Sequence, residues 1–167
     1  HMGWLELDLR STQEGKGKRL RPIICLLCCQ AAGGDWPRAI PAAAAVELIH
    51  NFSLIHDDIE DDSTTRRGRA TVWHHWGLAQ GLNAGDAMWT VSRLAIQRLP
   101  KHGHTPALVL RVAQTLDETC LELCKGQYLD LAFEERRHVS RHEYMQMIAG
   151  KTGALISASC AVGAMLA

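Results

Sequence analysis

Prolines and glycines divide this chain into long segments in which apolar residues recur at helical spacing, and no segment shows the alternation typical of strands. The first helix is expected to begin near Pro22 and to stop at Gly33-Gly34, with proline in its first turn and glycine after its end. Residues 61–71 are rich in charge, Ser and Thr, which is typical of a loop. Further helices are expected over residues 37–60, 77–99, 106–133, 141–148 and 151–167. The sequence therefore predicts an all-α helical bundle.

The last segment, residues 156–167, consists almost wholly of small and apolar residues and contains no stop signal. A helix of this kind needs packing partners on most of its sides, and the preceding helices do not supply them all. A length of 167 residues fits one domain or a large piece of one. We therefore expect a single domain over residues 1–167 that forms a partial bundle, a fragment of a larger one.

Composition excludes several classes of partner. The 18 basic residues balance 18 acidic ones, so the net charge gives no reason to expect nucleic acid or an anionic membrane. The longest apolar runs, such as residues 41–46, are far shorter than the roughly 20 residues that span a bilayer, so no transmembrane segment is expected. The first residues include Glu6, Asp8 and Arg10 in place of an apolar signal core. A cytoplasmic protein without a nucleic-acid partner is the expectation.

Three of the six cysteines, Cys25, Cys28 and Cys29, lie in one apolar run. Cys25 and Cys28 form a C-x-x-C pair, but no second pair or Cys/His tract completes a four-ligand zinc site. These surroundings favour reduced thiols that are buried as small hydrophobic side chains, with zinc binding and redox chemistry as alternatives. A reducing compartment fits this interpretation.

The helix expected over residues 37–60 carries an acidic face. Steps of three and four residues place six side chains on one side of it: Glu47, His50, Leu54, Asp57, Asp58 and Asp61. The three aspartates lie within about 6 Å of helix rise and repel one another, which a multivalent cation would relieve. Oxygen ligands suit Mg²⁺, which substrate phosphates usually complete. The alternative is a solvated acidic helix end, but the apolar residues around Phe52 and Ile55 indicate a buried helix whose carboxylates face a cavity.

Two basic clusters flank these carboxylates in the sequence. They consist of Lys16, Lys18, Arg19 and Arg21 on one side and of Arg66, Arg67 and Arg69 on the other. Arginine binds phosphate through a planar fork of donors, and Gly15 and Gly17 let the backbone approach a ligand closely. Either cluster alone is typical of a surface patch. Together with the acidic face, they predict a site for two diphosphates, one of them bridged by metal.

Five motifs in this chain are similar to those of the all-trans polyprenyl (isoprenyl) diphosphate synthases. They are GKGKRLRP at residues 15–22, DDIED at 57–61, RRG at 66–68, GQYLD at 126–130 and KTG at 151–153. In this order and spacing they cover nearly the whole chain and are far more specific than a lone D-D-x-x-D. The chain therefore resembles the N-terminal half of such a synthase, which implies a helical bundle of the isoprenoid synthase type with its C-terminal half absent.

The resemblance implies a role for each matching residue. The catalytic group would comprise Asp57, Asp58, Asp61 and Lys151, in which Asp57 and Asp61 bind the Mg²⁺ that bridges the allylic diphosphate. Arg66 and Lys151 would contact that diphosphate, helped by Gln127, Thr152 and Asp130, the last as an outer contact. Isopentenyl diphosphate would be held by Lys18, Arg21, His50 and Arg67. The helical spacing independently places His50 on the acidic face, and the alternative for it is a neutral histidine hydrogen-bonded within the core.

The reaction that the resemblance implies is a Mg²⁺-dependent prenyl transfer. Departure of the allylic diphosphate leaves a carbocation, the double bond of isopentenyl diphosphate attacks it, and loss of a proton gives an all-trans chain longer by five carbons. In related enzymes, residues just before the first aspartate motif set the chain length, and here these are Phe52 and Ser53. In such enzymes an aromatic ring at the position of Phe52, five residues before Asp57, favours a C20 product, with C15 next. Relatives are commonly homodimers, so a homodimer is expected.

The chain also departs from the family pattern. The second aspartate-rich motif, which binds a third metal, does not occur within these 167 residues, so the chain alone is expected to be inactive. Ala70 stands where many relatives have proline, and Trp73 stands where many have histidine. Both departures put the geometry of the loop beside the metal in doubt.

Three other functions compete with this interpretation. A non-catalytic regulatory subunit of a heteromeric prenyl synthase would account for the absent second motif. A metal-dependent phosphohydrolase would use His50 and His56 as ligands, but a spacing of six places them on nearly opposite sides of a helix. A terpene cyclase would have no need of the basic cluster at Lys18 and Arg21.

Overall fold

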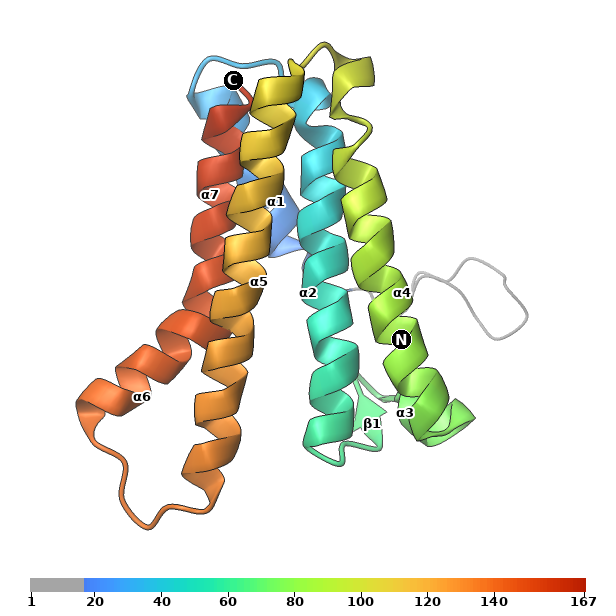
Figure 1. Cartoon of the computed structure of the whole chain (residues 1–167), viewed down its shortest axis with the longest axis vertical. Coiled ribbons are helices and arrows are strands. Elements are labelled where there is room, and N and C mark those ends of the chain that lie inside the picture. Colours follow the sequence, from blue (N-terminus) through green and yellow to red (C-terminus); the bar gives the residue numbers. More distant parts are fainter. Residues whose placement is uncertain (1–16) are drawn as a thin grey trace.

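The computed structural model describes residues 17–167, and almost all of this part of the chain is helical (Figure 1). The long helices are α1 (Leu20–Ala31), α2 (Ile40–Glu60), α4 (Leu78–Ile96), α5 (Pro106–Glu134) and α7 (Ala154–Met165). The shorter elements are the 3-10 turns η1 (Trp36–Ala39) and η2 (Leu99–His102), the helices α3 (Val72–Trp76) and α6 (Arg141–Ile148), and the π-helical turn η3 (Ala149–Gly153). The prediction of an all-α fold is confirmed.

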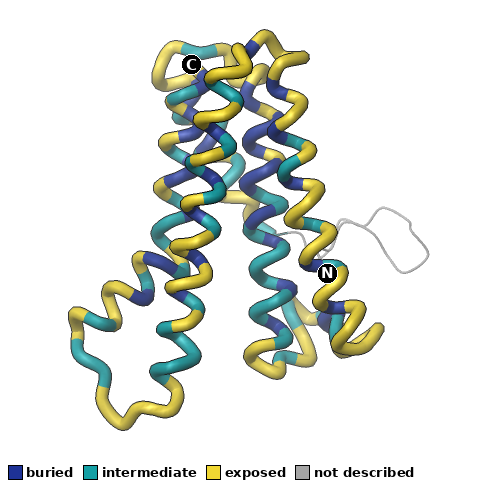
Figure 2. Tube along the Cα trace, viewed as in Figure 1, coloured by how far each residue is buried: buried dark blue, intermediate teal, exposed yellow. Residues whose placement is uncertain are grey.

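The long helices pack as two pairs that share one core. Helix α2 lies along α4, α1 lies along α7, and α5 contacts α7, α2 and η3 (Figure 1). Buried residues recur along the helices where these pack together (Figure 2), and the core includes Val46, Ile49, Leu116, Leu155 and Val162. Toward the end of the molecule that holds α3 and α6, the two pairs separate into two arms (Figure 1). One arm consists of α2 and α4, and the other consists of α6 and the end of α5. The site described below lies where the arms separate.

Local signals explain where the helices begin and end. Pro22 lies in the first turn of α1, and Gly33 follows the helix with a φ of 91°, a conformation that glycine adopts without strain. Thr105 caps α5 by accepting a hydrogen bond from the Leu108 N–H at 3.3 Å. Ser140 and Glu143 form a capping box at the start of α6. The predicted helices over residues 37–60, 106–133 and 141–148 are confirmed to within three residues.

Two glycines let the backbones of neighbouring elements come into contact. A Cβ atom built on Gly126 of α5 would lie 2.7 Å from Lys151 Cα in η3. A Cβ atom on Gly163 of α7 would lie 3.0 Å from Cys28 Cβ in α1. Since a real Cβ cannot occupy either position without displacing its neighbour, glycine is what allows these close crossings. The contact at Gly126 fixes the position of η3, which carries Lys151.

The expectation that no strand occurs is wrong in one place. Strands β1 (Thr65–Arg66) and β2 (Arg69–Ala70) form an antiparallel hairpin inside the predicted loop. Its two turn residues, Arg67 and Gly68, both have positive φ, as the twist of a two-residue hairpin requires. Strands of two residues are too short to show any alternation in the sequence. Helix α3 and the π-helical form of residues 149–153 were likewise not predicted.

The stretch Arg141–Met165 is long and apolar enough to cross a membrane by length and composition. In the structure this stretch comprises α6, η3 and α7, whose residues pack against α5 and α1 and contribute Leu155 and Val162 to the core. Such packing is typical of a core helix in a globular domain. The absence of a transmembrane segment stays a prediction.

All six cysteines are free thiols. Cys25 and Cys29 are buried, as predicted, and burial raises the pKa of Cys25 to about 12. Cys28 is half-buried, so the expectation of a buried side chain is confirmed only in part for this residue. Cys124, which lies outside that apolar run, is exposed on the cavity side of α5. Within residues 17–167, no group of three or more His, Cys, Asp or Glu side chains is placed to hold a metal ion, and this includes the C-x-x-C pair.

Candidate active site

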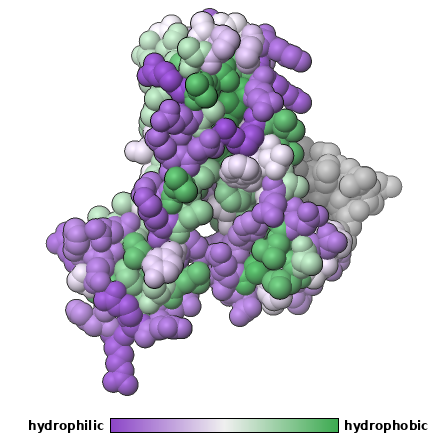
Figure 3. Space-filling view, viewed as in Figure 1, coloured by the Kyte–Doolittle hydropathy of each residue, from purple (hydrophilic) through white to green (hydrophobic). Residues whose placement is uncertain are grey.

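A cavity of about 440 Å³ opens where the two arms separate. The space-filling view shows a hollow between the arms, whose surfaces are mostly hydrophilic (Figure 3). The cavity walls come from α2, α5, η3 and the first turns of α1 and α7. Charged and polar lining residues include Arg21, His50, Asp57 and Lys151, and apolar ones include Phe52, Leu123, Leu131 and Leu155. The cavity therefore combines a charged region with an apolar wall.

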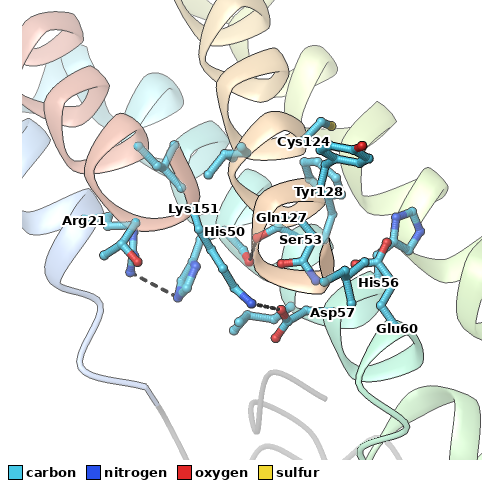
Figure 4. Close-up of a pocket in the computed structure, with 16 residues that line it drawn as sticks. Arg21, His50, Ser53, His56, Asp57, Glu60, Cys124, Gln127, Tyr128 and Lys151 are labelled. Atoms are coloured by element: carbon cyan, nitrogen blue, oxygen red, sulfur yellow. Dashed lines mark hydrogen bonds and ion pairs between the residues drawn. The ribbon is translucent and has the colours of Figure 1, made fainter. Parts of the chain in front are cut away.

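Asp57 pairs with two cationic side chains at the cavity, and its contact with Lys151 is drawn in Figure 4. Its Oδ1 lies 2.9 Å from Lys151 Nζ, and its Oδ2 accepts a hydrogen bond of 2.8 Å from Arg66 Nη2. Lys151 also donates to Asp130 Oδ2 at 2.5 Å, so that it joins α2 to α5. Burial alone would lower the pKa of Lys151, but the hydrogen bonds to Asp130 and Asp57 outweigh it and raise that pKa. Lys151 is thus a cation held between two carboxylates at the cavity wall.

Asp58 is buried on the other side of α2 and anchors the loop. Its Oδ1 accepts a hydrogen bond of 2.6 Å from Arg66 Nε, and its side chain is only 1% exposed. Burial raises the pKa of Asp58, and the hydrogen bond from Arg66 opposes this shift. Because one guanidinium bonds both Asp57 and Asp58, the hairpin is tied to the end of α2.

The departure from the family pattern at Trp73 has a structural role. The indole Nε1–H of Trp73 donates to the Ser63 carbonyl oxygen at 2.8 Å, and the Thr71 hydroxyl donates to the same oxygen at 2.8 Å. The Ser63 N–H in turn donates to the Asp58 carbonyl oxygen at 2.9 Å. These bonds close the loop onto α2, so Trp73 supports the position of Arg66 in this structure.

The acidic face is only partly directed at the cavity. Asp57 lines the cavity, whereas Asp58 is buried against Arg66 and Asp61 is exposed at the end of α2. The expectation that all three carboxylates face one cavity is therefore wrong, because the last turn of α2 directs successive side chains to different neighbours. Partial desolvation and the charge of Asp57 raise the pKa of Asp61. Asp130 and Glu134 add to this shift, and the charge of Lys151 opposes it.

The second basic group gathers around His50. Arg21 Nη1 lies 3.2 Å from His50 Nε2, and a Cβ on Gly17 would lie 3.0 Å from Arg67 Cζ. Burial, reinforced by the charges of Arg21, Arg67 and Arg66, lowers the pKa of His50 to about 4. A neutral imidazole can accept a hydrogen bond from the guanidinium, so His50 orients Arg21. Lys18, three residues before Arg21 in the sequence, is exposed to solvent. Gly15 and Lys16, which the sequence analysis also named, lie outside the described residues.

Gln127 and Thr152 both line the cavity. The Gln127 Nε2 atom and the Arg21 Nε atom are buried donors without a hydrogen-bond partner in residues 17–167. A buried donor without an acceptor costs free energy, which an anionic ligand in the cavity would recover. These two orphan donors therefore indicate that the charged region is built for an anion.

Phe52 and Ser53 also line the cavity, five and four residues before Asp57 and therefore a little over one helical turn from it. The Ser53 hydroxyl donates to the His50 carbonyl oxygen at 2.8 Å, which leaves its small side chain at the wall. Sequence reasoning named Gln127 but missed the apolar side chains around it on the opposite wall, which α5 forms. Its lining residues Leu123, Gln127 and Leu131 recur every four residues, and this helical spacing is the signal that would have identified them.

The donor chemistry of the acidic residues fits a divalent cation. Asp57 and Asp61 lie one turn apart on α2 and offer only carboxylate oxygens, the ligands that Mg²⁺ prefers. Partial burial raises the pKa of Asp61, and the nearby carboxylates of Asp57, Asp130 and Glu134 raise it further. In this structure Asp57 is paired with Lys151 and Arg66 instead, and residues 17–167 include no group of three or more potential ligands placed to hold a metal ion. A diphosphate that attracted these two cations would leave Asp57 available.

A family model described as polyprenyl synthetase matches residues 3–167. The chain belongs to the polyprenyl synthetase family. Among curated polyprenyl synthetase relatives, it is 43% identical over 150 residues to a geranylgeranyl diphosphate synthase of Methanosarcina mazei, covering 90% of this chain. It is 42% identical over 167 residues to a (2E,6E)-farnesyl diphosphate synthase of Mycobacterium bovis, covering all of this chain. Each match covers 45% of the relative, so the chain spans about half the length of these synthetases.

Solved structures place the chain in the same polyprenyl synthetase fold. A polyprenyl synthetase from Streptomyces coelicolor A3(2) matches 99% of this chain and 48% of its own, with a TM-score of 0.89 and 35% identity. A geranylgeranyl pyrophosphate synthetase from Pyrococcus horikoshii Ot3 matches 90% of this chain and 45% of its own, with a TM-score of 0.86 and 45% identity. The expected family and the helical-bundle type are therefore confirmed.

Proposed function

We propose that this chain is the N-terminal half of a trans-prenyltransferase that condenses isopentenyl diphosphate with an allylic diphosphate. The product would be an all-trans polyprenyl diphosphate longer by five carbons, together with diphosphate. The observation that carries this proposal is the meeting of Asp57, Arg66 and Lys151 at the wall of a cavity whose other walls are largely apolar. A charged region beside an apolar wall suits a substrate with a diphosphate head and a hydrocarbon tail.

The allylic diphosphate would bind beside Asp57. Lys151 and Arg66 would exchange their carboxylate partners for phosphate oxygens, and the guanidinium of Arg66 suits bidentate contact. Gln127 would supply the donor that now lacks an acceptor. A divalent cation such as Mg²⁺, held by Asp57 and Asp61, would neutralise charge on the departing diphosphate when bound.

Isopentenyl diphosphate would bind at the second basic group. Arg21 and Arg67 would hold its phosphates, with Lys18 as a further cation and neutral His50 orienting Arg21. The charges of Arg66 and Arg67 both act on His50, so the two diphosphates would bind near one another. Positioning two reactants in this way is the main contribution that the protein makes to the rate.

The apolar wall would protect the allylic carbocation. Phe52, Leu123 and Leu155 exclude water that would otherwise add to the cation. The proton lost from the condensation product would pass to the released diphosphate. With Phe52 at the wall, we propose C20 as the favoured product and C15 as the next, since a ring in this position would limit how far a chain extends.

The complete protein is proposed to be a homodimer. Exposed apolar side chains on the adjoining helices α4 and α5 support this, among them Trp89, Leu94, Leu110 and Leu121. A cytoplasmic location and the absence of a nucleic-acid partner remain expectations from composition. The relatives reported above are named as synthases and give no support to the regulatory-subunit alternative.

The phosphohydrolase alternative finds no support in the site. His50 faces Arg21 on α1, whereas His56 lies 3.3 Å from the Leu82 carbonyl oxygen of α4. The two histidines thus contact different helices and do not converge on one metal position.

The proposed function is tested with the complete protein, Mg²⁺, labelled isopentenyl diphosphate and allylic starters of five, ten and fifteen carbons. Chromatography of the dephosphorylated products is expected to show elongated prenyl alcohols, mainly of twenty carbons, and chelation of the metal is expected to abolish them. A folded complete protein that elongates none of the starters would reject catalysis and favour the regulatory subunit.

A further inference from the structure

His56 stands beside Asp57 on α2, but its ring faces α4 (Figure 4). Its Nε2 lies 3.3 Å from the Leu82 carbonyl oxygen, which can only accept, so the tautomer with a proton on Nε2 donates a hydrogen bond to α4. The ring also lies against Gly85 of α4, where a Cβ atom would overlap Nε2 and Cδ2 of the imidazole. Gly85 is therefore what makes room for the histidine ring between α2 and α4.

The same ring touches Phe52 on the cavity side. The Phe52 and His56 rings have centroids 5.9 Å apart and planes at 82°, an edge-to-face arrangement. Both residues line the cavity, and they lie one helical turn apart. The position of Phe52 thus depends on a ring that the backbone of α4 holds in place.

We propose that His56, seated against Gly85, is a positioning residue that fixes the Phe52 ring at the cavity wall and thereby sets the length of the product. The effect on product length rests on the proposed function, whereas the effect on the Phe52 ring does not. Without the His56 ring, Phe52 turns into the vacated space and the cavity deepens. With a methyl group at position 85, the His56 ring is pushed toward Phe52 and the cavity shortens.

The nearby charge is not what holds the ring. Asp86 Oδ1 lies 3.6 Å from His56 Nε2, but the Asp86 side chain is 76% exposed. An ion pair that exposed contributes little to the position of its partners. Asp86→Asn is therefore a matched control, because it changes the immediate surroundings of His56 while keeping the contacts with Gly85 and Leu82.

The first test observes the Phe52 ring without any turnover. The complete protein carries 4-fluorophenylalanine at position 52, and a second sample carries it at position 133, where Phe133 packs under Arg136 at 5.3 Å. In ¹⁹F spectra, His56→Ala is expected to shift and narrow the signal from position 52 and to leave that from position 133 unchanged. Gly85→Ala is expected to shift the position-52 signal when it is the only other change. In the His56→Ala background, Gly85→Ala is expected to add no further shift. Asp86→Asn is expected to leave the position-52 signal unchanged.

An unchanged position-52 signal in folded His56→Ala would overturn the proposal. The position-133 signal shows whether each variant is folded. Should His56→Ala fail to fold, His56→Gln carries the same test, since it keeps a donor for the Leu82 oxygen but lacks the ring.

The second test measures product length with the complete protein. His56→Ala is expected to move the main product at least one five-carbon unit longer, and Gly85→Ala to move it shorter. Elongation by wild type with unchanged lengths in both variants would contradict the role in product length and leave the proposed function intact. Absence of elongation by wild type would contradict the proposed function, and the ¹⁹F result would still decide the position of Phe52.

Discussion

Lys151 Nζ lies 2.9 Å from Asp57 Oδ1, so that a cation on η3 is joined directly to the acidic end of α2. The second bond of Lys151, to Asp130, ties the same cation to α5. Three of the elements that line the cavity, α2, α5 and η3, therefore meet at one ammonium group. This arrangement makes Lys151 both a structural tie and the cation that we propose for the allylic diphosphate.

Replacing Lys151 tests that double role. Lys151→Met leaves Asp57 and Asp130 without their shared cation, and we expect a loss of about 1–3 kcal/mol of stability from the unpaired charge. Binding of inorganic diphosphate, measured by calorimetry on the complete protein with Mg²⁺, is expected to weaken about 10- to 100-fold. Lys125→Met is the control, because Lys125 is an exposed cation that pairs with Glu122 of the same helix, α5, away from Asp57 and Asp130. Equal diphosphate binding by both variants would contradict the assignment.

The close crossing at Gly126 gives a second prediction. Gly126→Ala introduces a methyl group that would lie 2.7 Å from Lys151 Cα, so we expect a destabilisation of about 1–3 kcal/mol from overpacking. Gly153→Ala is the matched control, since its Cβ would lie 3.7 Å from the nearest atom and alanine favours a helix by up to about 1 kcal/mol. Chemical denaturation of both variants checks this. A Gly126→Ala protein as stable as Gly153→Ala would show that the crossing is loose.

The sequence allowed part of this site to be predicted. Helical spacing alone placed His50 and Asp57 on one side of a helix, and both line the cavity. The bonds of Arg66 to Asp57 and Asp58 depend on a hairpin whose turn has Arg67 in a left-handed conformation, and no residue pattern indicates that conformation for arginine. The pairing of Lys151 with Asp130 depends on how α5 and η3 pack, which periodicity within one helix does not determine.

Cavity length can be tested at Phe52 and Ser53, which stand five and four residues before Asp57. Ser53→Phe adds a ring at the wall and is expected to shorten the products, whereas Phe52→Ala removes a ring and is expected to lengthen them. Each change should move the main product of the complete protein by at least one five-carbon unit, as measured by chromatography. The wild-type distribution obtained with the same starters is the reference. Product lengths that do not change in either variant would contradict the proposed role of these residues.

The neutral state of His50 predicts a dependence of stability on pH. Its pKa is about 4 in the folded protein and near 6.5 when unfolded, so the unfolded state binds the extra proton first as the pH falls. Wild type is therefore expected to lose about 1–3 kcal/mol relative to His50→Gln between pH 6.5 and pH 4, and to show no change in that difference above pH 7. Urea denaturation of both proteins across this range gives the free energies. A constant difference would show that His50 is not held neutral by its surroundings.

The central claim is that the carboxylate of Asp57 serves prenyl transfer, and one comparison tests it directly. Asp57→Asn and Asp86→Asn make the same chemical change on neighbouring helices, but Asp57 is 14% exposed at the cavity and Asp86 is 76% exposed outside the proposed catalytic group. The complete protein is assayed with Mg²⁺, labelled isopentenyl diphosphate and a ten-carbon starter. We expect Asp57→Asn to lower the elongation rate by about 10²- to 10⁴-fold and Asp86→Asn to leave it close to wild type. Elongation by folded Asp57→Asn at the wild-type rate would contradict the account.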